Sequence, residues 1–199
     1  TVDNPPVNPL SDGVRTGLYE SLVKAEEDDS VKGVVLTGNG RAFIAGADIS
    51  EFGGNVEGIP LNEVFNKLEF CKKPVVAAIN GVALGGGLET ALCCNYRIAA
   101  ETAFVGLPEV NLGLLPGGGG TQRLPRLIGP GEALKMMLSG SHVPAKKALE
   151  MGIVDKTSKD VVAESIDFIK EMDSNNDNHP RVRDKNEKML EARGDENVL

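Results

Sequence analysis

The sequence predicts an α/β fold with a helical C-terminal part, and three observations support this prediction. Apolar runs typical of buried strands alternate with helical patterns early in the chain, as at residues 31–37 and 74–79. From Gly131 onward the patterns are those of short helices alone. Glycines gather between residues 81 and 120, where they permit tight turns. Strands that alternate with helices indicate an α/β core, and the later helices form a C-terminal part that follows this core.

The elements follow in order from apolar spacing and from turn residues. Ser11 is placed to cap a first helix, whose apolar side chains recur at helical spacing, as at Leu18 and Leu22. The predicted strands are residues 31–37, 74–79, 96–99 and 104–106. The further predicted helices are residues 62–71, 85–93, 132–138, 144–151 and 160–172. We expect one main domain over residues 1–172, followed by a truncated polar surface helix or linker over residues 173–199.

Composition argues against several classes of protein. The formal net charge of −8 and the sequence pI near 4.9 disfavour nucleic-acid binding, which needs clustered Lys and Arg. The longest apolar run is far shorter than the roughly 20 residues of a membrane-spanning helix, so no membrane span is expected. Three cysteines without CxxC spacing and only two histidines favour an intracellular protein without a metal site.

A glycine-rich turn after the strand at residues 74–79 is the first candidate for chemistry. Gly85, Gly86 and Gly87 lead into a helix start, where backbone N–H groups lack partners and can hold an oxyanion. Such a turn can also be purely structural, and neither GxxxxGK[ST] nor GxGxxG is completed here. A nucleotide site of those two types is therefore not expected.

Glu89 and Glu109 are acidic side chains beside glycine-rich segments. Glu89 falls in the first turn of the predicted helix at residues 85–93, and Glu109 follows the predicted strand at residues 104–106. Each alone could be an ordinary helix-start or solvated residue. Two carboxyl groups at one site could instead divide acid and base roles, one being ionised while the other is protonated.

Three longer motifs carry a resemblance to a known family. They are AFIAGADI at residues 42–49, KPVVAAINGVALGGGLETA at residues 73–91 and FVGLPEVNLGLLPGGGGTQRL at residues 104–124. Together they resemble the crotonase, or enoyl-CoA hydratase/isomerase, family. The resemblance implies a crotonase-like fold, which is a spiral of ββα units with a C-terminal helical part.

The resemblance also implies roles for individual residues. Glu89 and Glu109 would be the catalytic pair, and the backbone N–H groups of Ala47 and Gly86 would form the oxyanion hole. The N–H of Gly117 would help to place the water held between the two carboxyl groups. The expected substrate-binding residues are Ala45, Ala47, Asp48, Ile49, Ser50 and Gly86. Coenzyme A would be part of the substrate, so the resemblance implies no separate cofactor and no metal ion.

The implied activity is that of an enoyl-CoA hydratase in fatty-acid β-oxidation, with syn addition of water to trans-2-enoyl-CoA giving 3-hydroxyacyl-CoA. Family members that only isomerise a double bond commonly keep just the second glutamate, so Δ3–Δ2-enoyl-CoA isomerisation is expected as a side activity. The alternatives are another acyl-CoA enzyme of the family, such as an isomerase or thioester hydrolase, or a non-catalytic RNA-binding member.

Two further segments resemble the hydratase part of multifunctional fatty-acid oxidation proteins. They are NPPVNPL at residues 4–10 and PRVRD at residues 180–184. The expected partner is an acyl-CoA substrate, and the expected assembly is a homotrimer or hexamer, or a monomeric part of a larger chain. The expected locations are the bacterial cytoplasm or an organelle such as the peroxisome or mitochondrion.

Overall fold

The computed structural model describes residues 1–51, 58–175 and 179–194, which form two four-stranded sheets surrounded by helices. The first sheet has the strand order β1-β3-β5-β8 and is parallel throughout. Its strands are β1 (Val34–Thr37), β3 (Val75–Ile79), β5 (Tyr96–Ala100) and β8 (Lys156–Ser158). Every residue of β3 is buried, as its unbroken apolar run predicts for a central parallel strand.

The second sheet has the order β2-β4-β6-β7. Its strands are β2 (Ala42–Ile44), β4 (Val82–Leu84), β6 (Phe104–Gly106) and β7 (Val143–Pro144). The pairs β2/β4 and β4/β6 are parallel, whereas β7 joins β6 in the antiparallel direction. Because β2, β4 and β6 run the same way, their carboxyl ends meet at one edge of this sheet.

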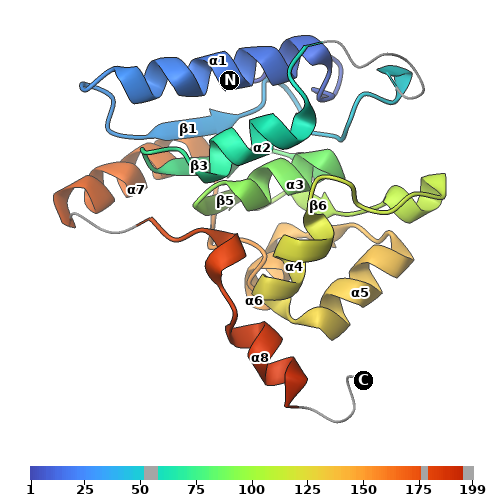
Figure 1. The fold of residues 1–199 in the computed structure, drawn as a ribbon. Coiled ribbons are helices and arrows are strands. Elements are labelled where there is room, and N and C mark those ends of the chain that lie inside the picture. The colour runs from blue at the N-terminus through green and yellow to red at the C-terminus, as the bar shows by residue number, and fades with distance from the viewer. Residues whose placement is uncertain (52–57, 176–178, 195–199) are drawn as a thin grey trace.

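The chain alternates between the two sheets and then adds a helix. The successive units are β1-β2-α2, β3-β4-α3 and β5-β6-α4, with α2 (Leu61–Glu69), α3 (Gly86–Cys93) and α4 (Gly120–Ile128). Helix α3 contacts both α2 and α4, so the three helices are stacked one beside the next (Figure 1). This arrangement confirms the predicted spiral of ββα units.

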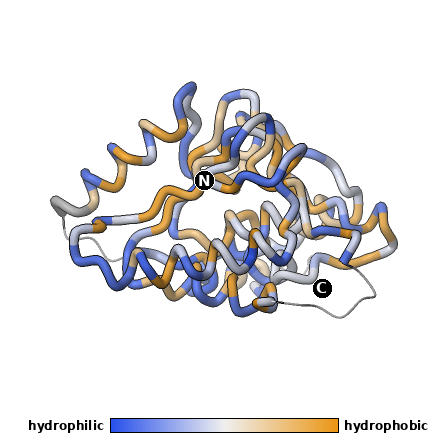
Figure 2. Tube along the Cα trace, turned by 90° about the horizontal axis from the view of Figure 1, so that it is seen from above, coloured by the Kyte–Doolittle hydropathy of each residue, from blue (hydrophilic) through white to orange (hydrophobic). Residues whose placement is uncertain are grey.

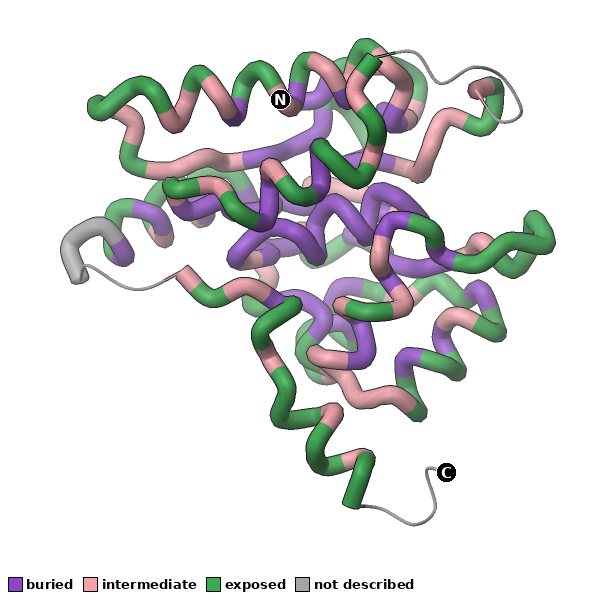
Figure 3. The backbone as a smooth tube through the Cα atoms, viewed as in Figure 1, coloured by how far each residue is buried: buried purple, intermediate pink, exposed green. Residues whose placement is uncertain are grey.

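Helix α3 lies at the centre of the molecule. All of its eight residues are buried, and the tube of Figure 3 is coloured as buried along this helix. A Cβ atom added at Gly87 would lie 1.9 Å from the carbonyl oxygen of Ile44, so only glycine allows α3 to approach β2 this closely. The helix start therefore lies directly against the end of β2.

The remaining helices pack around this core. They are α1 (Asp12–Glu27), α5 (Pro130–Ser139), α6 (Ala145–Met151), α7 (Val161–Asn175) and α8 (Glu187–Arg193). Three short 3-10 helices are η1 (Ile49–Glu51), η2 (Glu109–Leu112) and η3 (Val182–Asp184). Hydrophilic and hydrophobic stretches alternate along the outer helices, as expected for helices that bury one face (Figure 2). Among the described residues, no helix has the length and apolar character needed to cross a membrane.

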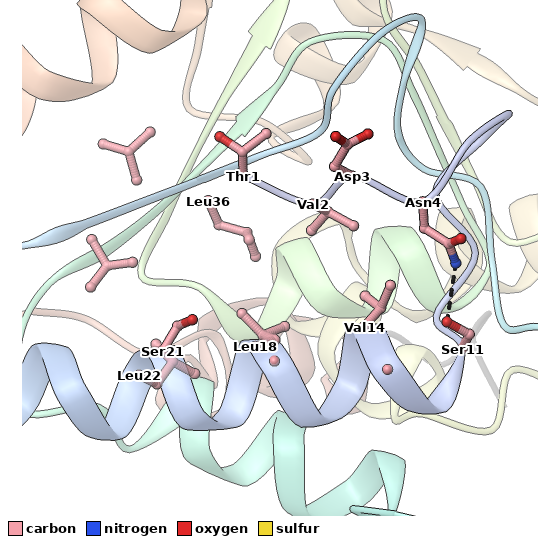
Figure 4. Close-up of a pocket in the computed structure, with 14 residues that line it drawn as sticks. Thr1, Val2, Asp3, Asn4, Ser11, Val14, Leu18, Ser21, Leu22 and Leu36 are labelled. Atoms are coloured by element: carbon pink, nitrogen blue, oxygen red, sulfur yellow. Dashed lines mark hydrogen bonds between the residues drawn. The ribbon is translucent and has the colours of Figure 1, made fainter.

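The first helix begins where the sequence predicts, but the cap differs. Ser11 occupies the N-cap position of α1 without capping it through its side chain. Its hydroxyl instead accepts a hydrogen bond of 3.0 Å from the side-chain amide of Asn4, beside a cavity of about 490 Å³ between α1 and the N-terminal segment (Figure 4). The amide of Asp12 is satisfied by the carboxylate of Glu51, at 2.7 Å.

The prediction that helices alone follow Gly131 is wrong. Both β7 and β8 lie in that part of the chain, and β8 completes the first sheet by pairing with β5. These strands are two and three residues long, and β8 is polar, so they show no apolar alternation that a sequence pattern could reveal. Helix α4 was also not predicted, because it starts in a glycine run and contains Pro125.

Candidate active site

A cavity of about 460 Å³ opens at the carboxyl ends of β2, β4 and β6. Its wall includes the backbone at residues 45–47 after β2, the turn at Gly85 and Gly86 after β4, and Glu109 after β6. Glu89, one turn into α3, also lines it. Ligand sites commonly form beyond the carboxyl ends of parallel strands, where loops from neighbouring strands converge. The two sequence-predicted carboxyl groups therefore share one cavity.

Glu89 is held in a fixed position by backbone amides. The residue is only 2% exposed, and its Oε1 accepts hydrogen bonds from the N–H groups of Gly118 and Gly120, each 2.8 Å long. Burial raises the pKa of Glu89, while these two amides and the positive charge of Arg123 act in the opposite direction. The carboxyl group is thus desolvated but well supplied with donors.

Glu109 has a different environment. It begins η2 and is half-buried, and its Oε2 is buried without a hydrogen-bond partner among the described residues. Burial raises its pKa to about 6, the backbone amide of Glu109 itself lowers it, and the nearby charge of Glu89 raises it further. Such a pKa suits proton transfer near neutral pH.

Two backbone amides lie together on the wall of the same cavity. Gly86 is the first residue of α3, so its N–H has no partner within the helix. A Cβ atom added at Gly86 would be 3.3 Å from the amide nitrogen of Ala47, which shows how closely the two segments approach. Gly85 turns the chain with φ of 52°, a conformation that favours glycine. The predicted oxyanion-hole residues are therefore neighbours in space.

The other predicted contact residues divide into two groups. Ala45, Ile49 and Gly117 line the cavity, as do Ala47 and Gly86. Asp48 and Ser50 are not among the lining residues. The carboxylate of Asp48 instead accepts hydrogen bonds from the Ser50 hydroxyl, at 2.6 Å, and from the Ser50 amide, at 3.0 Å.

The mouth of the cavity is apolar. Ile49 and Leu115 are 65% and 79% exposed, which is unusual for large aliphatic side chains. Both line the cavity together with Leu112 and Leu114, which are also exposed. This wall could cover an apolar group that enters from solvent.

Sequence reasoning missed the residues that hold Glu89. The amides of Gly118 and Gly120 were treated only as part of a glycine-rich motif, and Arg123 was considered only as a contact for the coenzyme A phosphates. Arg123 binds both carboxylate oxygens of Glu69 and the carbonyl oxygen of Gly118, each at 2.9 Å. The available signal was an arginine three residues after four consecutive glycines, but its acidic partner lies 54 residues earlier.

Comparison with known proteins agrees with this geometry. The family model described as "Enoyl-CoA hydratase/isomerase" matches residues 1–194. The chain belongs to the enoyl-CoA hydratase/isomerase family. Within this family it is 52% identical over 159 residues to a peroxisomal bifunctional enzyme of Danio rerio, a match that covers 80% of this chain and 22% of that relative. The predicted family is thereby confirmed.

Two further relatives belong to shorter proteins. A probable enoyl-CoA hydratase of Bacillus subtilis (strain 168) is 46% identical over 167 residues, covering 80% of this chain and 65% of the relative. The crystal structure of an enoyl-CoA hydratase from Bacillus anthracis has a TM-score of 0.78 at 39% identity, covering 83% of this chain and 68% of that one. The crotonase-like fold expected from the motifs is therefore confirmed. The chain spans less than a quarter of the length of the bifunctional relative.

Proposed function

We propose that this chain catalyses the hydration of trans-2-enoyl-CoA thioesters to 3-hydroxyacyl-CoA. The observation that carries this proposal is the shared cavity, in which two carboxyl groups of raised pKa face two neighbouring backbone amides. The names of the family relatives support the same reaction. Hydration is redox-neutral, and the groups it needs are a base, an acid and an oxyanion site, so the proposal includes no separate cofactor.

The amides of Ala47 and Gly86 would bind the thioester carbonyl oxygen. When water adds to C3, electron density moves onto this oxygen and gives it enolate character. Donors that are already oriented toward the oxygen stabilise this charge without reorganising, and one such donor is typically worth about 2.7–4 kcal/mol in the transition state. The close approach of Gly86 to the Ala47 nitrogen supports this role.

The two glutamates would have different roles. Glu89 receives two N–H donors and the field of Arg123, which favour its ionised form, so it would take the proton from the attacking water. Glu109, with its pKa of about 6 and no donor to Oε2 within the described part of the chain, would give a proton to C2. Water supplies a hydroxyl group to C3 and one proton overall. The proton on Glu89 returns to Glu109 through water before the next turnover.

The substrate would lie with its acyl chain against the apolar mouth and its coenzyme A part along residues 45–50. Ala45 and Ala47 have small side chains, which leave their backbone accessible from the cavity. Asp48 and Ser50 remain proposed contacts for the part of coenzyme A outside the cavity. The amide of Gly117, another lining residue, would help to place the attacking water.

The proposal is tested by following the ultraviolet absorbance of crotonyl-CoA, which is lost when the conjugated double bond is hydrated. We expect turnover by the wild type and losses of about 10²–10⁴-fold in kcat for Glu89→Gln and for Glu109→Gln. Near-wild-type turnover by either folded variant would contradict the assigned roles. The Glu101→Gln variant is a matched control, since Glu101 is exposed and lies outside the cavity.

A second activity, isomerisation of 3-enoyl-CoA to 2-enoyl-CoA, is proposed as a side reaction. It needs one carboxyl group that moves a proton between C2 and C4, and Oε2 of Glu109, which has no partner among the residues that the structure describes, could do this. Isomerisation should therefore survive Glu89→Gln better than hydration does, which an assay with 3-enoyl-CoA would measure. A thioester hydrolase would instead release free coenzyme A, which a thiol reagent detects.

The cellular setting is proposed from the relatives. One relative is named as peroxisomal and another comes from a bacterium, so we propose that the chain functions in a peroxisome or in the bacterial cytoplasm. A trimer or hexamer, or a role as one part of a larger chain, stays a prediction that sedimentation analysis of the expressed protein would test. An RNA-binding role is disfavoured by the net charge of −8.

A further inference from the structure

A buried ion pair contacts the loop that holds Glu89, outside the lining of the cavity. The carboxylate of Glu69, at the end of α2, is fully buried, and the side chain of Arg123, in α4, is 11% exposed. The guanidinium Nε and Nη2 atoms donate to the two oxygens of Glu69, each at 2.9 Å. This bidentate geometry orients the guanidinium plane.

The remaining Nη1 of Arg123 binds the loop that holds Glu89. It donates a 2.9 Å hydrogen bond to the carbonyl oxygen of Gly118, whose own N–H donates to Oε1 of Glu89. Glu69, Arg123 and Gly118 therefore form one continuous series of contacts that ends at the catalytic carboxylate. The series joins α2, α4 and α3 through a single residue of the loop.

This loop has little rigidity of its own. Residues 117–120 are four glycines, which lose more backbone entropy on ordering than any other residue type. Gly119 has φ of 94°, and a Cβ atom added at Gly118 would lie 2.5 Å from Oε2 of Glu89. A flexible segment that must present two N–H groups at fixed positions needs an external contact to hold it.

We propose that Arg123, oriented by Glu69, is a positioning residue that fixes the Gly118–Gly120 amides and thereby the carboxylate of Glu89. The expected effect on kcat rests on the proposed hydratase function. The expected effect on the position of the Gly118–Gly120 amides does not. Arg123 would touch neither the substrate nor the reacting atoms. It would affect the reaction through the position and the pKa of Glu89.

Arginine and lysine should differ at this position. Lysine carries the same charge but presents a point donor without a planar fork, so it cannot bind both oxygens of Glu69 and the Gly118 carbonyl in the same way. Among the described residues, the charged and titratable groups around Glu89 are Glu109 from η2, Arg123 from α4 and Cys93 from α3, with Glu69 paired to Arg123. Arg123→Lys thus separates the contribution of charge from that of geometry.

The experiment compares the wild type with Arg123→Met, Arg123→Lys and Glu69→Gln. Hydration of crotonyl-CoA gives kcat and KM, and carbon-13 NMR of labelled glutamate carboxyl groups gives the Glu89 pKa, with the signal assigned by its loss in Glu89→Gln. We expect kcat to fall by up to about 10²-fold in Arg123→Met and Glu69→Gln with KM little changed, because a small displacement of a catalytic group costs rate. The Glu89 pKa should rise in Arg123→Met. In Arg123→Lys, which keeps the charge but loses the planar fork, the Glu89 pKa should rise less than in Arg123→Met, and kcat should fall.

The matched control is Asp155→Asn. It weakens another ion pair, between the buried Arg97 and the exposed Asp155 at 2.9 Å, which joins β5 to the segment before β8 and does not line the cavity. This control should lower stability while leaving kcat and the Glu89 pKa unchanged. If Arg123→Met does not fold, Arg123→Lys and Glu69→Gln provide the same readouts.

The outcomes separate this inference from the proposed function. A wild type that is active, with folded Arg123 and Glu69 variants that match the control in kcat and in the Glu89 pKa, would overturn the positioning role alone. A wild type that hydrates no enoyl-CoA would overturn the proposed function. The NMR titration would then decide the positioning role by itself: a Glu89 pKa raised in Arg123→Lys as well as in Arg123→Met supports it, and a pKa raised in Arg123→Met alone, or in neither, refutes it.

Discussion

Replacing Glu109 by glutamine should make the protein more stable and much less active. The pKa of Glu109 rises from its usual 4.5 to about 6 in the folded protein, mainly through burial. At about 1.36 kcal/mol per pKa unit, a fully buried carboxyl group with this shift would cost about 2 kcal/mol in the ionised state. Because Glu109 is only half-buried, solvent screening reduces this to about 1 kcal/mol.

The sign of the effect follows from proton binding. The folded protein holds the proton on Glu109 until the pH exceeds about 6, whereas the unfolded chain releases it near 4.5. The destabilising cost is therefore fully present above pH 6 and is relieved as the pH falls from 6 to 4.5. Glutamine is neutral throughout, so Glu109→Gln should gain about 1 kcal/mol over the wild type at pH 8 and lose that advantage toward pH 4.5.

Urea denaturation of both proteins in steps from pH 8 to pH 4.5 measures this difference. The exposed Glu101→Gln variant, tested in parallel, is the control for removing a carboxyl group outside the cavity. An equal or lower stability of Glu109→Gln at pH 8, or a gain that is the same at pH 8 and pH 4.5, would refute the reasoning from desolvation. The Glu109→Gln preparation should also have lost about 10²–10⁴-fold in kcat for crotonyl-CoA relative to the wild type.

Three further predictions concern Glu89 and the residues around it. Glu89→Gln removes a nearby negative charge, so the pKa of Glu109 should fall, as carbon-13 NMR titration would show. Gly118→Ala should cost about 1–3 kcal/mol of unfolding free energy, because the new methyl group would lie 2.2 Å from the Phe65 ring. The control is Gly131→Ala, which should cost nothing because no atom of another segment lies within 4 Å of the new methyl group. Arg183→Met, which removes a 3.2 Å contact to Glu69 from a half-exposed side chain, should lower kcat less than Arg123→Met does.

Much of the fold was predictable because the central elements carry strong local patterns. The strand at residues 74–79 appears as β3, and the helix that opens at the glycine turn appears as α3. Strand β8 could not be predicted, because its three residues, Lys156–Ser158, are polar and belong to the sheet only through pairing with β5. The division at residue 172 stays a prediction, and helix α7 extends from Val161 to Asn175 across it.

The candidate site was predictable to the extent that its residues lie in contiguous motifs. Glu89 and Gly86 share one helix start, and Glu109 follows directly after a strand, so their positions could be inferred from residues nearby in sequence. Glu69 could not be found in this way. It lies at the end of an ordinary amphipathic helix, and only tertiary packing brings it to Arg123. The positioning contacts are thus the part of the site that needs the structure.

The unequal supply of hydrogen-bond donors explains how one cavity can contain both an acid and a base. Burial raises the pKa of both groups, so desolvation alone does not distinguish the two side chains. The amides of Gly118 and Gly120 donate to Oε1 of Glu89 and favour its ionised form, as a base requires. Oε2 of Glu109 has no donor among the described residues, and burial raises the pKa of this group to about 6, which favours the acid role. We therefore expect the two donors from the glycine loop to give Glu89 the base role and leave Glu109 the acid role.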